Sequence, residues 1–248
     1  MVRCQMFFKD GEVKTASRGG GDYDVSTTHL RETPAIVEFF EKHPNVVLDG
    51  ELYSHGRSLQ SLSGTARLKE WEERCRVLEY WIYDICDDTK IFNDRLDFLA
   101  KNRSQLQSDG NVVVIEHVLL ESYSKIKAQH DKWVQEGYEG LVMRNPQKTY
   151  GYGKRSSDMI KLKDYTDGEF KITGISEGLR DEDMCFTLVT SKGKEFKAKP
   201  MGSRELKDEY LENMEEIIGK MATVKYFAFS EDGVPMQPVL KSIRGYGE

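Results

Sequence analysis

Two short acidic segments of this chain carry the residue types that bind a divalent metal ion. The first is Asp49-Gly50-Glu51, which follows an apolar run, and the second is Glu139-Gly140, which precedes one. A hard cation such as Mg²⁺ takes oxygen ligands and keeps several waters, so one or two carboxylates are sufficient. We therefore take Glu51 and Glu139 as candidate metal ligands. Each segment has a plain alternative, because Asp-Gly is common in turns and an acid is common where a loop meets a strand.

Two lysines, Lys161 and Lys163, stand on either side of Leu162 in a strand-like segment. Side chains alternate across a strand, so both ammonium groups are expected on one face. Such charges neutralise phosphate oxygens in phosphoryl and nucleotidyl transfer, which makes both lysines candidate catalytic residues. The alternative is an exposed strand with solvated lysines, but the apolar neighbours Ile160 and Leu162 indicate a partly buried segment.

One aromatic and one basic residue are weaker candidates. Tyr83 precedes Asp84 in an otherwise apolar segment, and its ring is of the kind that stacks on a purine base. A tyrosine of the core is an equally good interpretation of that position. Arg18 precedes three glycines, so we expect its guanidinium on a flexible turn, where it suits contact with phosphate. Neither pattern indicates a function by itself.

The first two thirds of the chain mix strands with helices that position these residues. Asp10-Gly11 between two strand-like runs is typical of a hairpin, here over 3–17. Apolar periodicity and capping residues predict the other elements. Strands are expected at 46–53, 78–85, 112–118, 141–144 and 159–163, and helices at 33–42, 58–73, 91–107 and 124–136.

The pattern changes near residue 165 to short strands separated by turns that contain glycine. Strands are expected at 170–175, 186–189, 195–199 and 222–229, and an acidic helix at 203–218. Several short strands around one helix are typical of a small Greek-key barrel such as the oligonucleotide-binding fold. We therefore predict an α+β chain with one domain at 1–165 and a barrel at 166–248.

Composition narrows the class of protein. The chain has 248 residues, of which 38% are hydrophobic and 31% charged, as in globular domains. Four scattered cysteines without a C-x-x-C pair argue against a zinc site or a disulfide framework. No apolar run approaches the ~20 residues that span a bilayer, so we expect no membrane partner. The net charge of −6 requires any nucleic-acid-binding surface to gather its basic residues on one face.

Five segments, taken in order, resemble the motifs of a known family. They are Ser17-Arg18-Gly19-Gly20, Leu48-Asp49-Gly50-Glu51-Leu52, Ile82-Tyr83-Asp84-Ile85, Glu139-Gly140-Leu141-Val142 and Lys161-Leu162-Lys163. Their order and intervals resemble covalent nucleotidyltransferases, most closely the small ATP-dependent DNA ligases of the bacteriophage type. The family's first motif is Lys-x-Asp-Gly-x-Arg. Arg3 stands where its arginine falls, so the nucleophilic lysine is expected just upstream of residue 1.

The resemblance implies a fold and a reaction. It implies a nucleotidyltransferase (adenylation) domain of antiparallel sheets with flanking helices, followed by an oligonucleotide-binding barrel. It also implies that nicks in duplex DNA are sealed through enzyme–AMP and DNA-adenylate intermediates, with ATP and Mg²⁺ as cofactors. The resemblance assigns nucleotide binding to Arg3, Arg18, Glu51, Tyr83, Glu139, Lys161 and Lys163. Lys241 and Arg244 resemble the family's last basic motif, so we expect weak contacts with phosphate or DNA from these two residues.

Other expectations follow from the resemblance and from the missing lysine. We expect a monomer in the cytoplasm, or in the host cytoplasm if the source is viral, acting in DNA replication, repair or recombination. Residues 1–248 are not expected to adenylate themselves, so they are interpreted as a fragment or split form whose upstream polypeptide supplies the lysine motif. One alternative is a non-catalytic nucleic-acid-binding remnant. Another is an RNA ligase or an enzyme of the mRNA-capping type.

Overall fold

The computed structural model describes residues 2–153, 157–177 and 184–246. The chain forms two compact units, Met1–Leu162 and Lys163–Glu248, and each is described by itself. Helices and sheets occur together in both, which confirms the predicted α+β class. Within the described residues, no helix has the length and apolar character needed to cross a bilayer.

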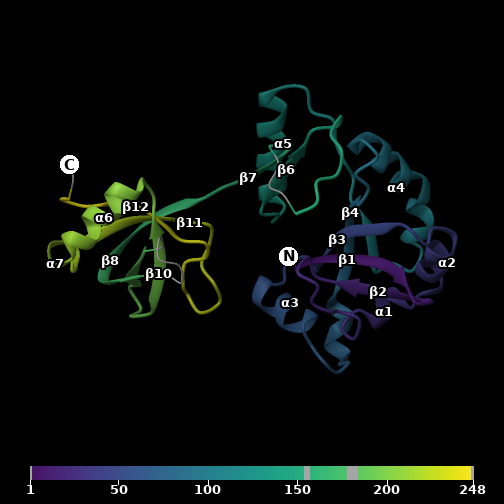
Figure 1. Cartoon of the computed structure of the whole chain (residues 1–248), viewed down its shortest axis with the longest axis horizontal. Coiled ribbons are helices and arrows are strands. Elements are labelled where there is room, and N and C mark those ends of the chain that lie inside the picture. Colours follow the sequence, from purple (N-terminus) through teal and green to yellow (C-terminus); the bar gives the residue numbers. More distant parts are fainter. Residues whose placement is uncertain (1, 154–156, 178–183, 247–248) are drawn as a thin grey trace. The chain divides into compact units, whose positions relative to one another are not determined.

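The first unit is built on a five-stranded sheet with the order β2-β1-β3-β4-β5 (Figure 1). Its strands are β1 (Val2–Lys9), β2 (Glu12–Ala16), β3 (Val47–Tyr53), β4 (Glu79–Ile85) and β5 (Val112–Val114). The predicted hairpin is β1-β2, and Asp10 and Gly11 at its turn both have positive φ, as a tight two-residue turn requires. The sheet is mixed rather than purely antiparallel, because β5 pairs parallel to β4. β5 is also shorter than the predicted 112–118.

Helices cover one face of this sheet. They are α1 (Thr28–Arg31), α2 (Pro34–Lys42), α3 (Leu59–Ala66), the 3₁₀ helix η1 (Glu73–Val77) and α4 (Phe92–Leu106). The prediction of one helix over 58–73 was wrong, because the helix ends at Ala66. Five of the seven residues 67–73 are charged and all but Leu68 are exposed, so a longer helix would bury little further apolar surface. The short α1 was not predicted.

Strand alternation gives the sheet one apolar face and one polar face. The side chains that point toward the helices are completely buried. They include Cys4, Leu48, Leu52, Tyr80 and Ile82. The register places Arg3 opposite Glu51 on one side and Trp81 opposite Glu51 on the other. Because successive side chains alternate, these three residues share the face away from the helical core. The candidate site residues of β1, β3 and β4 are therefore on one surface.

A β-bulge interrupts the pairing of β3 with β4. Asp49 lies opposite Asp84 and Gly50 lies opposite Ile82, so Tyr83 is the extra residue. A Cβ atom on Gly50 would lie 2.5 Å from the carbonyl oxygen of Trp81, which explains why glycine is required. Asp-Gly here belongs to the interior of β3 and not to a turn. Glu51 is likewise within the strand.

The remainder of the first unit is a small α/β element. α5 (Tyr123–Gln135) packs on β6 (Gly140–Arg144), and β6 pairs with β7 (Met159–Lys163) as a separate two-stranded sheet (Figure 1). Ser122 caps α5 by accepting a hydrogen bond from the backbone N–H of Lys125. All three elements agree with the sequence prediction.

The second unit is a closed barrel with the strand order β10-β12-β11-β8-β9. Its elements are β8 (Thr166–Glu177), β9 (Met184–Val189), β10 (Glu195–Pro200), α6 (Arg204–Glu212), α7 (Met214–Ile217), β11 (Met221–Tyr226) and β12 (Val239–Ile243). Phe186, Leu188, Val224 and Leu240 are completely buried inside it. The predicted helix 203–218 is divided at Asn213, and β11 ends before the predicted residue 229. β12 was not predicted, because it acquires its strand character from pairing with β10 and β11.

Candidate active site

An ion pair between Arg3 and Asp49 lies at the centre of the polar sheet face. Arg3 donates from Nε to Oδ1 of Asp49 at 2.9 Å and from Nη2 to Oδ2 at 2.7 Å. The Asp49 side chain is almost completely buried, whereas that of Arg3 keeps one third of its surface exposed. Burial lowers the pKa of Arg3, but the hydrogen bonds and charge of Asp49 outweigh it, and the net shift is upward. Arg3 is therefore a permanent cation held in one orientation, with part of its surface open to a ligand.

Two tyrosine hydroxyls complete the shell of Asp49. Tyr83 donates to Oδ1 at 3.3 Å, and Tyr150 donates to Oδ2 at 2.7 Å while it accepts from Arg3 at 2.8 Å. Burial raises the pKa of both tyrosines, and the charge of Asp49 raises it further, so both hydroxyls stay protonated as donors. Tyr150 was missed in the sequence analysis, since no pattern around it indicates a contact with a strand about 100 residues earlier.

Glu51 is influenced by charges from the second sheet. Burial raises its pKa, the ammonium group of Lys161 lowers it, and the carboxylates of Glu139 and Asp49 raise it. Glu51 comes from β3, while Glu139 immediately precedes β6 and Lys161 lies in β7. Three of the predicted residues, from two separate sheets, therefore interact electrostatically. Gly140, with a φ of 139°, supplies a backbone conformation that only glycine adopts readily just after Glu139.

Glu51 and Glu139 supply the oxygen ligands that a hard divalent cation takes. Among the described residues, no group of three or more His, Cys, Asp or Glu side chains forms a metal-binding cluster. A magnesium ion commonly uses one or two protein carboxylates and completes its shell with waters and phosphates. The described residues do not form a metal site in which every ligand comes from the protein.

The two predicted lysines fall on different sides of the boundary between the units. Lys161 is exposed in β7 and belongs to the first unit, whereas Lys163 belongs to the second. The ammonium group of Lys163 lies 5.0 Å from the ring centroid of Phe227, a cation–π contact within the second unit. The alternation along β7 that suggested a pair is present, but each lysine belongs to a different unit.

The remaining basic candidates lie in less specialised surroundings. Arg18 is exposed at the tip of a turn that the backbone N–H of Ser17 closes by donating to the carbonyl of Gly21 at 2.7 Å. In the barrel, Lys241 pairs with Asp167 at 2.6 Å. Arg244 pairs with Glu169 at 2.9 Å. Both barrel pairs are solvent-exposed, so a phosphate would compete with these carboxylates for the two cations.

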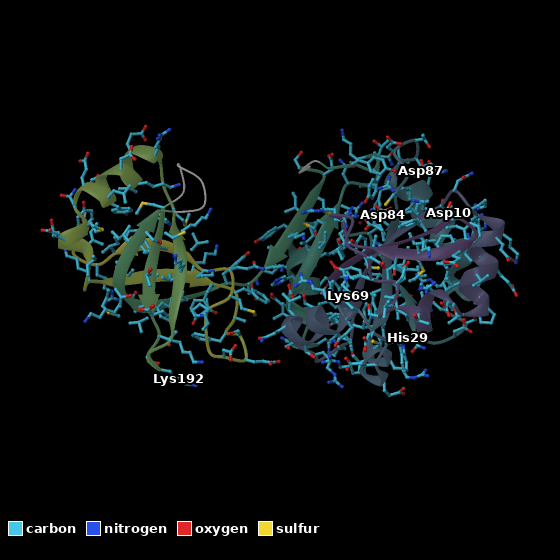
Figure 2. The ribbon with its side chains drawn as sticks, turned by 60° about the horizontal axis from the view of Figure 1, so that its bottom comes forward. Asp10, His29, Lys69, Asp84, Asp87 and Lys192 are labelled. Carbon is cyan, nitrogen blue, oxygen red and sulfur yellow. The ribbon has the colours of Figure 1, made fainter. Side chains whose placement is uncertain are left out.

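A second, deeper ion network lies at the end of β4. Asp84, labelled in Figure 2, is completely buried. It accepts hydrogen bonds from Nε of Arg95 at 2.7 Å and from Nη2 of Arg95 at 3.1 Å. Arg144 at the end of β6 also donates to it. Arg95 donates further to the carbonyl of Lys90 at 2.7 Å. Neither arginine was predicted, although a buried Asp84 in an apolar strand signals that a cation must come from elsewhere.

Comparison with known proteins identifies the family. A model of the ATP dependent DNA ligase domain matches residues 2–163, which is more than half of the chain. The chain belongs to the ATP-dependent DNA ligase family. This confirms the resemblance drawn from the ordered motifs. A DNA ligase of African swine fever virus is 26% identical over 194 residues, covering 74% of this chain and 43% of the viral protein. The chain thus spans less than half the length of this relative.

Solved structures show the same fold over nearly the whole chain. A structure of Lig E DNA ligases, described as binding DNA with a minimal scaffold, matches with a TM-score of 0.71 and 21% identity, covering 98% of this chain and 89% of that one. The ATP-dependent DNA ligase of bacteriophage T7 in complex with ATP matches with a TM-score of 0.57 and 18% identity, covering 98% of this chain and 89% of that one. At these identities the likeness establishes the fold, in which a nucleotidyltransferase unit precedes an oligonucleotide-binding barrel.

Proposed function

We propose that this chain is the catalytic core of an ATP-dependent DNA ligase that seals nicks in duplex DNA. The observation that carries the proposal is the polar sheet face on which Arg3 is paired with Asp49 and lies opposite Glu51 in the register. The charges of Glu139 and Lys161, from the second sheet, also influence the pKa of Glu51. A purely structural sheet face has no need for a buried Asp49 that holds a partly exposed arginine beside a further carboxylate. Family membership supports the same conclusion.

The reaction transfers AMP twice and then releases it. AMP from ATP is first carried on a lysine, which the resemblance places before residue 1, and pyrophosphate leaves. AMP next moves to the 5′-phosphate of the nick. The 3′-hydroxyl then attacks that phosphate, a new phosphodiester bond forms, and AMP is the leaving group. The described residues serve the last two steps, because these need phosphate neutralisation and positioning rather than a protein nucleophile.

Each polar group of the site has a proposed role in these steps. Glu51 and Glu139 hold Mg²⁺, which supplies positive charge to phosphate oxygens when it is bound. Lys161 and Lys163 neutralise the phosphate oxygens on which charge builds up. The ring of Tyr83 stacks on adenine, while its hydroxyl keeps the hydrogen bond to Asp49. Arg3, oriented by Asp49 and Tyr150, contacts the nucleotide with its exposed surface.

The barrel is proposed to bind duplex DNA beside the nick. The division of labour is a catalytic domain at 1–165 and a DNA-binding domain at 166–248. Lys241 and Arg244 then reach phosphates by leaving their carboxylate partners, Asp167 and Glu169. A contribution of Arg18 to phosphate binding is proposed on the same electrostatic grounds, since it is exposed on a turn.

A pre-adenylylated nick tests the proposal on residues 1–248 directly, because this substrate needs no lysine nucleophile. We expect sealing and AMP release in the presence of Mg²⁺, measured in a single turnover. The matched control is the same nick with a 3′-deoxy end, which binds but cannot be sealed. Binding without any sealing of the reactive nick would favour a non-catalytic nucleic-acid-binding protein. Preference for a nick in RNA would favour an RNA ligase.

A second experiment tests the first step, the transfer of AMP from ATP to a lysine. With labelled ATP, residues 1–248 alone are expected to form no stable AMP adduct. In a variant, a Lys-x-Asp-Gly segment is fused in frame so that it ends directly before Val2. This variant is expected to become labelled on the added lysine. Labelling of an internal lysine would contradict the placement of the motif.

A further inference from the structure

Four ring side chains form a closed cycle beside the two candidate metal ligands. The ring centroids of Tyr53 and Trp81 are 4.9 Å apart, and those of Trp81 and Tyr138 are 6.4 Å apart. Tyr138 continues the cycle to His55 at 5.0 Å, and Tyr53 and His55 close it with a hydrogen bond of 2.9 Å between Oη and Nδ1. We refer to Tyr53, His55, Trp81 and Tyr138 as the aromatic cycle.

The members of the aromatic cycle flank Glu51 on one side and Glu139 on the other. Tyr53 is two residues beyond Glu51 on the same face of β3, and Trp81 lies directly opposite Glu51 in β4. Tyr138 immediately precedes Glu139. Tyr53 contacts Trp81, and Trp81 contacts Tyr138, so a chain of ring contacts runs from the strand of Glu51 to the residue before Glu139. One set of contacts thus connects the surroundings of both ligands.

The backbone does not provide this connection near Glu139. β6 is in a two-stranded sheet with β7 and has no ladder to the five-stranded sheet among the described strands. A two-stranded ribbon is marginally stable on its own, so side chains must locate it. At the far end of β6, Arg144 reaches Asp84, but that contact is five residues from Glu139. Next to Glu139, the ring of Tyr138 contacts Trp81 of the five-stranded sheet.

The chain around Tyr138 is shaped to bring its ring to the cycle. Gly137 has a φ of 90°, and a Cβ atom there would meet Nε2 of His55 at 3.4 Å. The backbone N–H of Tyr138 donates to the carbonyl of Trp133 at 3.0 Å, which ends α5 and turns the chain toward β3. Trp81 is in turn oriented by donating from Nε1 to Glu79 at 2.7 Å. The rings are therefore held in fixed orientations.

We propose that Tyr138 is a positioning residue that sets the separation between Glu51 and Glu139 and thereby the affinity of the site for its divalent cation. This inference rests on the proposed function. It requires the ring of Tyr138 and not its hydroxyl, because ring contacts with His55 and Trp81 carry the connection. Groups that orient metal ligands typically change metal affinity by about 10- to 100-fold when they are removed.

The test compares Tyr138→Leu with Tyr138→Phe and uses Mn²⁺ as the probe. Mn²⁺ binding is measured by electron paramagnetic resonance with the pre-adenylylated 3′-deoxy nick bound, and sealing of the reactive nick is measured separately. Tyr138→Leu is expected to weaken Mn²⁺ binding by about tenfold and to raise the Mg²⁺ concentration needed for sealing, with unchanged nick affinity. Tyr138→Phe is expected to keep wild-type values. Tyr123→Leu on exposed α5 surface is the matched control.

Each other outcome contradicts the proposal. Unchanged Mn²⁺ affinity in Tyr138→Leu would overturn it, even if the melting temperature falls, because a merely structural ring would affect stability alone. Weakened nick affinity with normal Mn²⁺ affinity would make Tyr138 a nucleic-acid contact. Loss of Mn²⁺ binding in Tyr138→Phe would assign the effect to the hydroxyl. If the unaltered chain binds the nick but does not seal it, the proposed function fails instead, which is distinguishable from all of these.

Discussion

The two units of this chain use charged residues in opposite ways. In the first unit, Asp49, Asp84 and Arg95 are almost completely buried, and each is held by several hydrogen bonds. In the barrel, the pairs of Lys241 with Asp167 and of Arg244 with Glu169 lie on the surface. A buried ion cannot lose its partner without a large cost, whereas an exposed one exchanges its partner for water. The first unit is thus built for fixed geometry, and the barrel keeps cations that can move to a ligand.

The largest expected effect comes from removing the buried anion. Asp84→Ala leaves Arg95 buried without its carboxylate, so we expect the free energy of unfolding of the first unit to fall by about 3–5 kcal/mol. All three tryptophans, Trp71, Trp81 and Trp133, lie in this unit, so denaturant titration followed by their fluorescence reports on it alone. The matched variant in the barrel is Asp167→Ala, followed by circular dichroism, with an expected loss below about 1 kcal/mol. Equal losses in the two units would break the comparison.

A glycine in each unit sharpens the contrast in packing. Gly50→Ala places a methyl group against the carbonyl of Trp81 and the ring of Tyr80, neither of which is free to move. We expect a loss of about 1–3 kcal/mol in unfolding free energy, measured by tryptophan fluorescence. Gly174→Ala in the barrel meets Thr187 at 3.8 Å, an ordinary contact, and should stay within about 0.5 kcal/mol. A tolerated Gly50→Ala would show that β3 and β4 can separate at the bulge.

The lysines at the boundary test whether fixed geometry serves catalysis. Lys161→Ala and Lys163→Ala are each expected to slow single-turnover sealing of a pre-adenylylated nick by about tenfold or more, equivalent to about 1.4 kcal/mol per decade. Nick affinity should change much less, because charges that act on the transition state contribute little to ground-state binding. Equal losses of rate and affinity would place the lysines on the DNA backbone. Unchanged sealing in both variants would favour the binding-remnant alternative.

The barrel cations should influence affinity but not rate. Lys241→Ala and Arg244→Ala are each expected to lower the salt dependence of nick binding by about one phosphate contact, measured as the slope of log affinity against log salt. The single-turnover sealing rate at saturating protein should be unchanged. Lys192→Ala, in the turn between β9 and β10 and labelled in Figure 2, serves as a control with the same loss of charge. An unchanged slope in the first two variants would leave both residues as surface ion pairs only.

The smallest expected effect is the reactivity of a half-buried thiol in the first unit. Burial raises the pKa of Cys86 to about 11, although the hydrogen bond that Gln5 donates to its sulfur acts in the opposite direction. Its thiolate is then scarce at pH 8 and increases about tenfold per pH unit, since only the deprotonated form reacts. In a Cys185→Ser background, iodoacetamide labelling of Cys86, followed by peptide mass spectrometry, should rise steadily up to pH 10. A plateau by pH 9 would mean that this part of the first unit is more open to water than its burial indicates.

Sequence alone determined the class of the fold, most element positions and the family. Hairpin signals, apolar periodicity and capping residues are local, so β1 to β4, α2, α4 and α5 were predictable from a few adjacent residues each. The exceptions depend on contacts that local sequence does not encode. The helix predicted over 58–73 ends early because the charged residues after Ala66 have no core to pack against. β12 acquires its strand character from pairing with partners that are distant in sequence.

For the site, sequence indicated the carboxylates and lysines but not the groups that hold them. Glu51, Glu139 and Lys161 are recognisable by residue type and spacing. That Glu51 is influenced by both others depends on the placement of β6 and β7, which no spacing encodes. The contacts of Asp49 with Tyr150, and of Asp84 with Arg95 and Arg144, were decided by the tertiary structure alone. The physical reason is that a buried charge requires a partner, and the folded chain can supply it from any element that reaches the same place.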